Sequence, residues 1–416
     1  MPQRRFWRFL AVIVLAAFAL RLTIAAEYQG LSSPPKAEAN PDQVDYEALG
    51  WRLAAGGGYS DANGNPTAVR APGTPVLIEM IYIVFGHEHA AVRIVFCVLS
   101  ALTCLVAGLL AAELFGNFAG LCAAALLALL PNHAYYAQHM LSEVPYALVI
   151  AVACLWTATS RHERGLWPFD LGAGLMFGLA FLTRPQSVLC LPLVGLLALA
   201  GATRARGAGL LQFARIAFVF ALVVAPWIVR NELQLGTLAP NTLGGHTFWG
   251  AHNEVVTSDP ATIGSWRPVD SLVDAAHPLP VGEAARSAAA WGYGLDFVRA
   301  HLAEMPRLLF WKLVRQYSPF FETPNRLVYW SFALAWTLVF PLFLVGLWLG
   351  LRHARASTLL LLVPLVSTLA SGLVFYGAMR FRDGDAALYV VLAAAALAAR
   401  APQRWKIWVG EPVPTT

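Results

Sequence analysis

The stretch Phe9 to Ala26, FLAVIVLAAFALRLTIAA, holds one charged residue, Arg21, and follows a basic segment with Arg4, Arg5 and Arg8. Its length approaches the roughly 20 apolar residues that a helix needs to cross a bilayer. A cleaved signal peptide also begins with basic residues, but its apolar core is usually only about 7 to 15 residues long. We therefore interpret this stretch as a retained membrane-spanning helix.

The rest of the chain has the same apolar character. Of its 416 residues, 58% are hydrophobic and 13% are charged, whereas about 25% of the residues of a soluble domain are charged. Together with the first run, at residues 6–26, runs of near-spanning length lie at residues 91–114, 117–139, 143–160, 167–183, 187–202, 209–230, 327–350, 356–377 and 385–401. We predict an all-α polytopic membrane protein with about ten transmembrane helices.

The cysteine and charge patterns argue against other classes. The five cysteines all fall inside apolar runs and lack the paired spacing of a disulfide framework or a zinc site. The formal net charge is +5, but the arginines form short clusters between apolar segments. Such clusters are typical of an oriented membrane protein. We expect a lipid bilayer as partner and no nucleic acid.

Basic clusters set the predicted topology. Two further apolar stretches, Pro72 to Phe85 and Met305 to Phe321, are short or carry basic residues, so we expect them to be interfacial or re-entrant. If neither crosses, every basic cluster lies on the cytoplasmic side, together with both termini. These clusters are Arg4/Arg5/Arg8, Arg161/Arg164, Arg204/Arg206, Arg352/Arg355 and Arg404/Lys406.

This topology divides the chain into three parts. Residues 1–230 form a transmembrane module that includes a first outer loop at 27–90 with an interfacial helix. Residues 231–326 form a larger outer loop and a second interfacial helix, and residues 327–416 form the last three helices and a short cytoplasmic tail. The turns near Glu143, Arg184 and Arg380 also face outside, so the polar residues that a membrane protein does not otherwise need gather on one side.

The first outer loop contains two carboxylates next to a tyrosine, in the order Asp42, Asp45, Tyr46. In the structural interpretation, Asp42 is the N-cap of a short helix that begins near Gln43. In the functional one, a carboxylate at the membrane boundary deprotonates an acceptor hydroxyl. Asp42 is the first candidate base and Asp45 the alternative.

Other outer turns supply an acid and several arginines. Glu143 begins an apolar helix, where it could complement the helix dipole or help to bind a sugar hydroxyl. Arg184, Arg380 and Arg382 lie outside, against the orientation preference of arginine. Their side chains could snorkel at helix ends, or their planar guanidinium groups could hold a phosphate.

The large outer loop opens with Arg230 and Asn231 and continues to His246 and Asn253, among glycines and tryptophans. These residue types suit sugar binding, although an ordinary compact loop also uses them. His246 and the other histidines considered, His133, His139 and His252, lack the spacing of zinc ligands. We predict no metal site. A divalent metal is compatible with the chemistry but unsupported.

The order of these motifs along the chain resembles bacterial GT-C membrane glycosyltransferases of family 39, the group of protein O-mannosyltransferase-like and aminoarabinose-transferase-like enzymes. The resemblance covers about residues 1 to 400. It is carried by Asp42-x-x-x-Tyr46, Pro66-Thr67-Ala68-x-Arg70-x-Pro72-Gly73-x-Pro75, Ser142-Glu143, Leu182-Thr183-Arg184-Pro185, Pro226-Trp227-x-x-Arg230-Asn231 and Arg380-Phe381-Arg382. Gln43 stands where many relatives carry a second acidic residue, which weakens the case for a paired-acid metal site. The stretch Asp383-Gly384-Asp385 also departs from the proline-bearing pattern expected there.

The resemblance implies a GT-C-like helical bundle in the bacterial inner membrane, with a periplasmic active site and no firm cofactor. It implies inverting transfer of a sugar from a polyprenyl-phosphate donor to an acceptor that is lipid, polysaccharide or protein. By motif position, Asp42 corresponds to the base. The residues that would contact substrate or phosphate are Tyr46, Arg70, Glu143, Arg184, Arg230, Asn231, His246, Asn253, Arg380 and Arg382.

Two other functions are compatible with the hydropathy. A multi-pass transporter or lipid flippase would also place polar residues within a helical bundle. Its polar residues would gather near the midplane of the bilayer and often within inverted repeats, and neither feature is evident here. A non-catalytic scaffold would leave the outer acids and arginines without a role. The sidedness of the charges therefore favours an enzyme.

Overall fold

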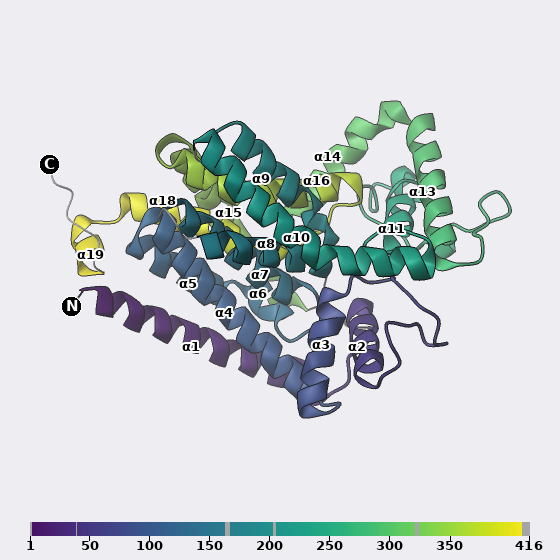
Figure 1. Ribbon diagram of the computed structural model, residues 1–416, viewed down its shortest axis with the longest axis horizontal. Coiled ribbons are helices and arrows are strands. Elements are labelled where there is room, and N and C mark those ends of the chain that lie inside the picture. Colours follow the sequence, from purple (N-terminus) through teal and green to yellow (C-terminus); the bar gives the residue numbers. More distant parts are fainter. Residues whose placement is uncertain are drawn as a thin grey trace.

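A computed structural model describes residues 2–38, 40–162, 167–202, 205–320, 323 and 325–409. Apart from one isolated bridge between Ser60 and Pro66, the regular structure of these residues is helical. The long helices lie side by side in one bundle (Figure 1). Arg164 and Arg204, two members of the predicted cytoplasmic clusters, lie outside the described residues.

Ten helical regions correspond to the ten predicted apolar runs. In the described part of the chain, six helices are long and apolar enough to cross a membrane: α1 (Pro2–Tyr28), α4 (His89–Phe115), α7 (Glu143–His162), α10 (Arg206–Leu235), α15 (Arg326–His353) and α16 (Arg355–Val374). Four shorter regions match the other runs: α5 (Asn117–Leu129), α8 (Trp167–Thr183), η1 (Pro185–Leu189) with α9 (Cys190–Leu199), and α18 (Ala386–Arg400). The all-α polytopic class is confirmed.

One predicted run is divided in two. The sequence predicts a single span over residues 117–139, but α5 ends at Leu129 and a separate helix, α6 (Pro131–Tyr136), follows it. Pro131 cannot donate a backbone hydrogen bond to the preceding turn, so it ends one helix and occupies the first position of the next. The apolar composition continues across the break, which is why hydropathy alone does not reveal it.

The two predicted outer loops lie at the same end of the bundle. In Figure 1 both termini and α19 (Gln403–Trp408) are at the left, whereas the helices of both loops are at the right. The first loop forms α2 (Pro41–Ala54) and α3 (Gly73–Phe85); the second forms α11 (Leu243–Ala251), α12 (Glu254–Ser258), η2 (Val269–Ser271), α13 (Glu283–Ala300), η3 (Leu302–Glu304) and α14 (Met305–Tyr317). This arrangement agrees with the predicted exposure of both loops on one side.

The first helix is an integral part of the bundle. Arg21 is completely buried, and its guanidinium donates to Ser100 Oγ at 2.6 Å and to the carbonyl oxygens of Leu127 and Ala128 at 3.1 Å each. These two carbonyls belong to the end of α5, where a helix has no internal donors left. The charge that interrupts the apolar run therefore ties α1 to α4 and α5.

Helix α14 buries polar side chains and exposes apolar ones, which is the reverse of an amphipathic helix in a soluble protein. Lys312 and Gln316 are buried, whereas Phe310 is more than half exposed. The ammonium group of Lys312 lies 2.8 Å from His252 Nε2 and donates to the carbonyl oxygen of Leu373 at 3.0 Å. Burial lowers the pKa of Lys312 to about 7. An exposed apolar face agrees with the predicted interfacial position of this helix.

Candidate functional site

The carboxylate of Asp42 does not cap its helix. The sequence predicts a helix that begins near Gln43 with Asp42 as N-cap, but α2 begins at Pro41 and its N-cap is Asn40. The Asn40 side chain accepts a hydrogen bond from the backbone N–H of Asp42 at 3.1 Å. The capping interpretation of Asp42 is therefore wrong, and its carboxylate is free to contact other segments.

Two arginines hold the Asp42 carboxylate. Arg70 Nη2 donates to Oδ1 at 2.7 Å, and Arg380 Nη1 donates to Oδ2 at 2.8 Å. Burial by itself would raise the pKa of Asp42, but the charges and hydrogen bonds of Arg380 and Arg70 outweigh burial and lower the pKa to about 2. Asp42 is thus a fully charged carboxylate at neutral pH.

The ion pairs continue on both sides of Asp42. Arg380 Nε donates to Glu143 Oε1 at 2.7 Å, and Arg184 Nη1 lies 3.0 Å from the same oxygen. On the other side, Arg70 Nη2 lies 2.7 Å from Asp45 Oδ2. Three carboxylates and three guanidinium groups therefore alternate in one network. Because its members come from α2, the loop before α3, α7, the turn after α8, and α17 (Met379–Gly384), the network forms only in the folded chain.

Buried ion pairs explain the outer arginines better than snorkelling does. The side chain of Arg184 is 8% exposed and that of Glu143 is 2% exposed, so this pair has little contact with water. The guanidinium of Arg184 also lies over the ring of Phe381, 5.9 Å from its centroid. A snorkelling arginine would instead extend its charge into water. The second carboxylate oxygen of Glu143, Oε2, is buried and has no hydrogen-bond partner among the described residues.

A cavity of about 420 Å³ opens beside this network. Asp42, Tyr46, Arg70, Arg184 and Arg380 contribute its charged and polar edge. The remaining lining is mainly aliphatic and aromatic: Val69, Ala71, Phe181, Pro185, Val188, Ala239, Pro240, Leu243, Trp291, Phe375, Tyr376 and Phe381, with Ser142, Thr183, Gln186, Asn241, Gly244, Thr247 and Ser371 between them. Such a cavity combines an anion-binding edge with a wall suited to an apolar chain or a sugar ring face.

Several lining residues were not predicted from the sequence. Trp291 comes from the middle of α13, and Phe375 and Tyr376 follow the end of α16. Asn241 lies in the segment between α10 and α11. The only sequence signal for them is their position on the outer side. Aromatic residues are so frequent there that position alone does not select Trp291, Phe375 and Tyr376.

Arg382 lies apart from the network although it belongs to the same predicted motif as Arg380. Its guanidinium lies 3.8 Å from the ring centroid of Trp336 and donates to the carbonyl oxygen of Ser318 at 2.7 Å. Residues two apart on a helix do not face the same way, so only one of the two arginines of α17 can point to Asp42. Asp383, next to Arg382, accepts hydrogen bonds from Asn132 at 3.1 and 3.2 Å.

The four residues predicted at the large loop, Arg230, Asn231, His246 and Asn253, do not line the cavity, and Arg230 and Asn231 belong to α10. Arg230 donates to the carbonyl oxygens of Thr67 and Tyr59, at 2.6 and 2.8 Å. Its neighbour Asn231 donates to the carbonyl oxygen of Ala239. Asn253 is the N-cap of α12, and the backbone carbonyl of His246 accepts from Trp266.

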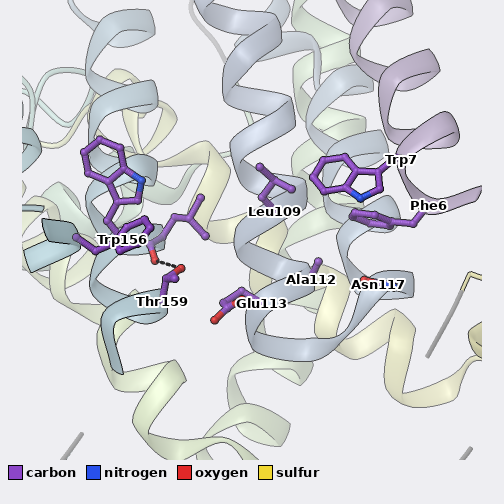
Figure 2. A pocket seen from close by; sticks show the side chains of 10 residues that line it. Phe6, Trp7, Leu109, Ala112, Glu113, Asn117, Trp156 and Thr159 are labelled. Carbon is purple, nitrogen blue, oxygen red and sulfur yellow. Dashed lines mark hydrogen bonds between the residues drawn. The ribbon is translucent and has the colours of Figure 1, made fainter. Parts of the chain in front are cut away.

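A second cavity, of about 330 Å³, lies near the bundle end that carries the N-terminus. Figure 2 shows Phe6 and Trp7 on one side of it and Trp156 on the other, with Leu109 and Glu113 between them. The nearby hydroxyl of Thr159 is bonded to a backbone carbonyl of its own helix. None of the predicted site residues lines this cavity. The predicted site residues that line a cavity therefore line the one beside Asp42.

Comparison with known proteins identifies the fold. Residues 69–229, less than half of the chain, match the family model of dolichyl-phosphate-mannose-protein mannosyltransferases. The chain also superposes on the archaeal oligosaccharyltransferase AglB from Archaeoglobus fulgidus in complex with an inhibitory peptide and a dolichol-phosphate, with a TM-score of 0.55 and 15% identity over 95% of this chain. The chain has a GT-C fold. The fold implied by the sequence resemblance is thereby confirmed.

Other solved structures show the extent of the likeness. AglB tethered with an acceptor peptide that contains the NVT sequon gives a TM-score of 0.56 with 15% identity. The chain spans about half the length of these AglB chains, 49 to 50%. ArnT from Cupriavidus metallidurans bound to undecaprenyl phosphate gives a TM-score of 0.43 with 14% identity, over 94% of this chain and 77% of that one. No curated protein matches the chain.

Proposed function

We propose that this GT-C chain is an inverting glycosyltransferase that moves a sugar from a polyprenyl-phosphate donor to an acceptor on the outer side of the membrane. One observation carries the proposal: a carboxylate, Asp42, lies between two arginines at the polar edge of a largely apolar cavity. The mannosyltransferase family match and the complex of AglB with a dolichol-phosphate support the donor class.

The reaction assigns a role to each part of the cavity. The acceptor oxygen attacks the anomeric carbon of the sugar, the bond from that carbon to the phosphate oxygen breaks, and polyprenyl phosphate leaves with the electron pair. Asp42 accepts the proton of the acceptor. Arg380 and Arg184 stabilise the negative charge that develops on the phosphate, because guanidinium groups bind phosphate through two parallel hydrogen bonds. The apolar wall near Trp291 receives the isoprenoid chain or the sugar face.

Donor binding would also make Asp42 a better base. A carboxylate with a pKa of about 2 is weakly basic, and a general base works best with a pKa near the working pH. A phosphate that attracts Arg380 or Arg70 weakens the interactions that lower the pKa of Asp42. The carboxylate would then become more basic only when the donor is in place.

The sidedness of the network supports an enzyme over a transporter or lipid flippase. The network joins α2, the loop before α3, the start of α7 and the turn after α8, and Figure 1 shows α2 and α3 on the side of the bundle away from the termini. A translocation path would place such groups near the midplane. Together with the basic clusters, this arrangement supports cytoplasmic termini and a site on the outer side of the membrane. The resemblance to bacterial enzymes supports the inner membrane, and therefore a periplasmic site.

Transfer of a labelled sugar tests the proposal. Purified protein is incubated with a panel of polyprenyl-phosphate sugars and with membrane extract, and the label is followed into lipid, polysaccharide and protein. We expect incorporation from at least one donor, lost in Asp42→Asn. Movement of an intact polyprenyl-phosphate sugar between the leaflets of a vesicle, without label transfer, would instead identify a flippase.

A further inference from the structure

A second group of chemically competent side chains lies beside the middle of α2. Glu47 projects from this helix toward the turn between α3 and α4, where His87 and His89 are two residues apart. His87 Nε2 lies 2.6 Å and His89 Nε2 lies 3.4 Å from Glu47 Oε1. One ligand atom from each of the three side chains lies within 4.8 Å of the other two. Two nitrogens and one oxygen therefore converge from separate parts of the sequence.

The surroundings fix the orientation of these groups. The ring of His87 stacks on Trp51 with centroids 4.0 Å apart and an interplanar angle of 7°. Tyr82 donates from its hydroxyl to Glu47 Oε1 at 3.1 Å. The turn that brings the two histidines together contains Gly86 with φ of +76°, a conformation that side-chain-bearing residues rarely adopt. Oriented ligands with supporting neighbours are typical of built metal sites.

A hydrogen-bonded pair accounts for only part of this arrangement. In the absence of a metal, one imidazole donates an N–H to Glu47, as the 2.6 Å contact of His87 shows. That contact gives no reason for His89 to direct its Nε2 at the same oxygen. Ligand atoms around a tetrahedral ion with bonds of about 2.0 to 2.2 Å are roughly 3.3 Å apart. The His89 contact already has this spacing, and the His87 contact reaches it by opening roughly 0.7 Å.

We propose that Glu47, His87 and His89 bind one zinc ion or a similar transition-metal ion. Imidazole nitrogens and a carboxylate are ligands for zinc, whereas magnesium and calcium prefer sites made of oxygen alone. The three side chains are partly exposed, which leaves a fourth position for water. The ion would join α2 to the turn between α3 and α4. Since Asp42 lies on the same helix, the metal would position that helix without taking part in the transfer.

Metal binding is measured on the full chain in detergent, purified with a tag free of histidine. After treatment with a chelator, the protein is dialysed against zinc, and zinc per chain is determined by mass spectrometry together with the midpoint of thermal unfolding. We expect about one zinc per wild-type chain and a rise in the midpoint. Glu47→Gln and His89→Gln should lower zinc affinity at least about tenfold. Magnesium should not compete.

Two variants outside the three ligands serve as controls. His277→Gln removes an exposed histidine that contacts Asp274 at 3.0 Å, so it reports nonspecific binding by a lone histidine pair. Asp42→Asn tests whether the ion belongs to the cavity network. The proposal requires that both retain wild-type zinc affinity. Loss of zinc in Asp42→Asn, with retention in Glu47→Gln, would overturn it, and so would the absence of zinc uptake by the wild type.

If Glu47→Gln and His89→Gln fail to fold, the wild type still decides the question. Cobalt in a tetrahedral site gives intense visible absorption, which zinc should abolish in proportion to the zinc bound. Weak absorption typical of an oxygen-rich or octahedral site would contradict the assignment. None of these measurements depends on transferase activity, so failure of the metal site and failure of the proposed glycosyltransferase function remain distinguishable.

Discussion

Replacement of Asp42 by asparagine distinguishes a role of this residue as general base from a role in the stability of the fold. Asparagine has nearly the same shape and keeps hydrogen-bonding atoms, but it cannot accept a proton at neutral pH. Because Asn40 is the N-cap of α2, the helix keeps its cap in the variant. We therefore expect a folded protein that has lost about 10² to 10⁴ in turnover, the usual contribution of a general base.

The contacts of Asp42 give the structural cost of the same change. Its pKa of about 2, instead of the ordinary 3.8, corresponds to about 2.5 kcal/mol of preference for the charged form. The side chain is 23% exposed, so water recovers part of this loss in the variant. Arg70 keeps Asp45 and Arg380 keeps Glu143 as partners. The expected loss of stability is therefore at most about 2 kcal/mol, which folding can tolerate.

The assay measures transfer and donor binding on the same preparation. Turnover is followed with the labelled donor that the wild-type enzyme accepts, and donor binding is followed by fluorescence quenching or filtration. Asp45→Asn is the matched control, because Asp45 lies on the same helix and contacts Arg70, but its side chain is 49% exposed and does not line the cavity. We expect this control to retain turnover within about tenfold of the wild type.

The outcomes distinguish three mechanisms. Full turnover in Asp42→Asn with loss only in Asp45→Asn would move the base to Asp45. Full turnover in both variants would refute a base on the first loop. Loss of donor binding along with turnover in Asp42→Asn would show that the carboxylate acts by holding Arg70 and Arg380 in place, and not as a base.

Three further expectations follow from the same geometry. Arg380→Lys and Arg184→Lys should weaken donor binding about tenfold or more, because a lysine cannot form the paired hydrogen bonds of a guanidinium, and unchanged affinity in both would confine these residues to the ion-pair network. Cysteines at the exposed positions Asn63 and Ser271 should react with a membrane-impermeant reagent from the periplasm, and reaction from the cytoplasm alone would invert the topology. Since folding lowers the pKa of Asp42, its contribution to stability is full above about pH 4 and is lost as the pH falls toward 2, so thermal unfolding midpoints of the wild type and Asp42→Asn should converge over that range. A difference at pH 2 as large as the difference at pH 7 would contradict that pKa.

Hydropathy predicts the helices of this protein well because the bilayer leaves the backbone few alternatives. Each spanning segment must satisfy its own hydrogen bonds, so a long apolar run can hardly be anything but a helix. The prediction is weaker where composition and backbone geometry disagree. At Pro131 the apolar run continues, but the missing N–H ends α5. The sequence prediction also placed the N-cap of α2 at Asp42, although Asn40 before Pro41 is a recognisable start signal.

The site was predictable in its location but not in its partners. The sidedness of charges correctly placed Asp42, Arg70 and Arg380 on one face, but Arg380 is 338 residues from Asp42 and nothing in the local sequence pairs them. Helix register decided between Arg380 and Arg382, and that register depends on where the short helix α17 begins. The polar residue types that hold loops together are the same as those that bind sugars, so residue type alone does not separate the two roles.

In the proposed reaction, the alternation of charges in the network couples donor binding to the basicity of Asp42. Asp42, Asp45 and Glu143 already neutralise Arg70, Arg184 and Arg380. A donor phosphate therefore does not meet free arginines but must compete with carboxylates for them. Each arginine that turns toward the phosphate leaves a carboxylate less stabilised, and a buried carboxylate in that condition binds protons more readily. Because the arginines are shared, one cavity can hold a strong ion-pair network and still provide a general base.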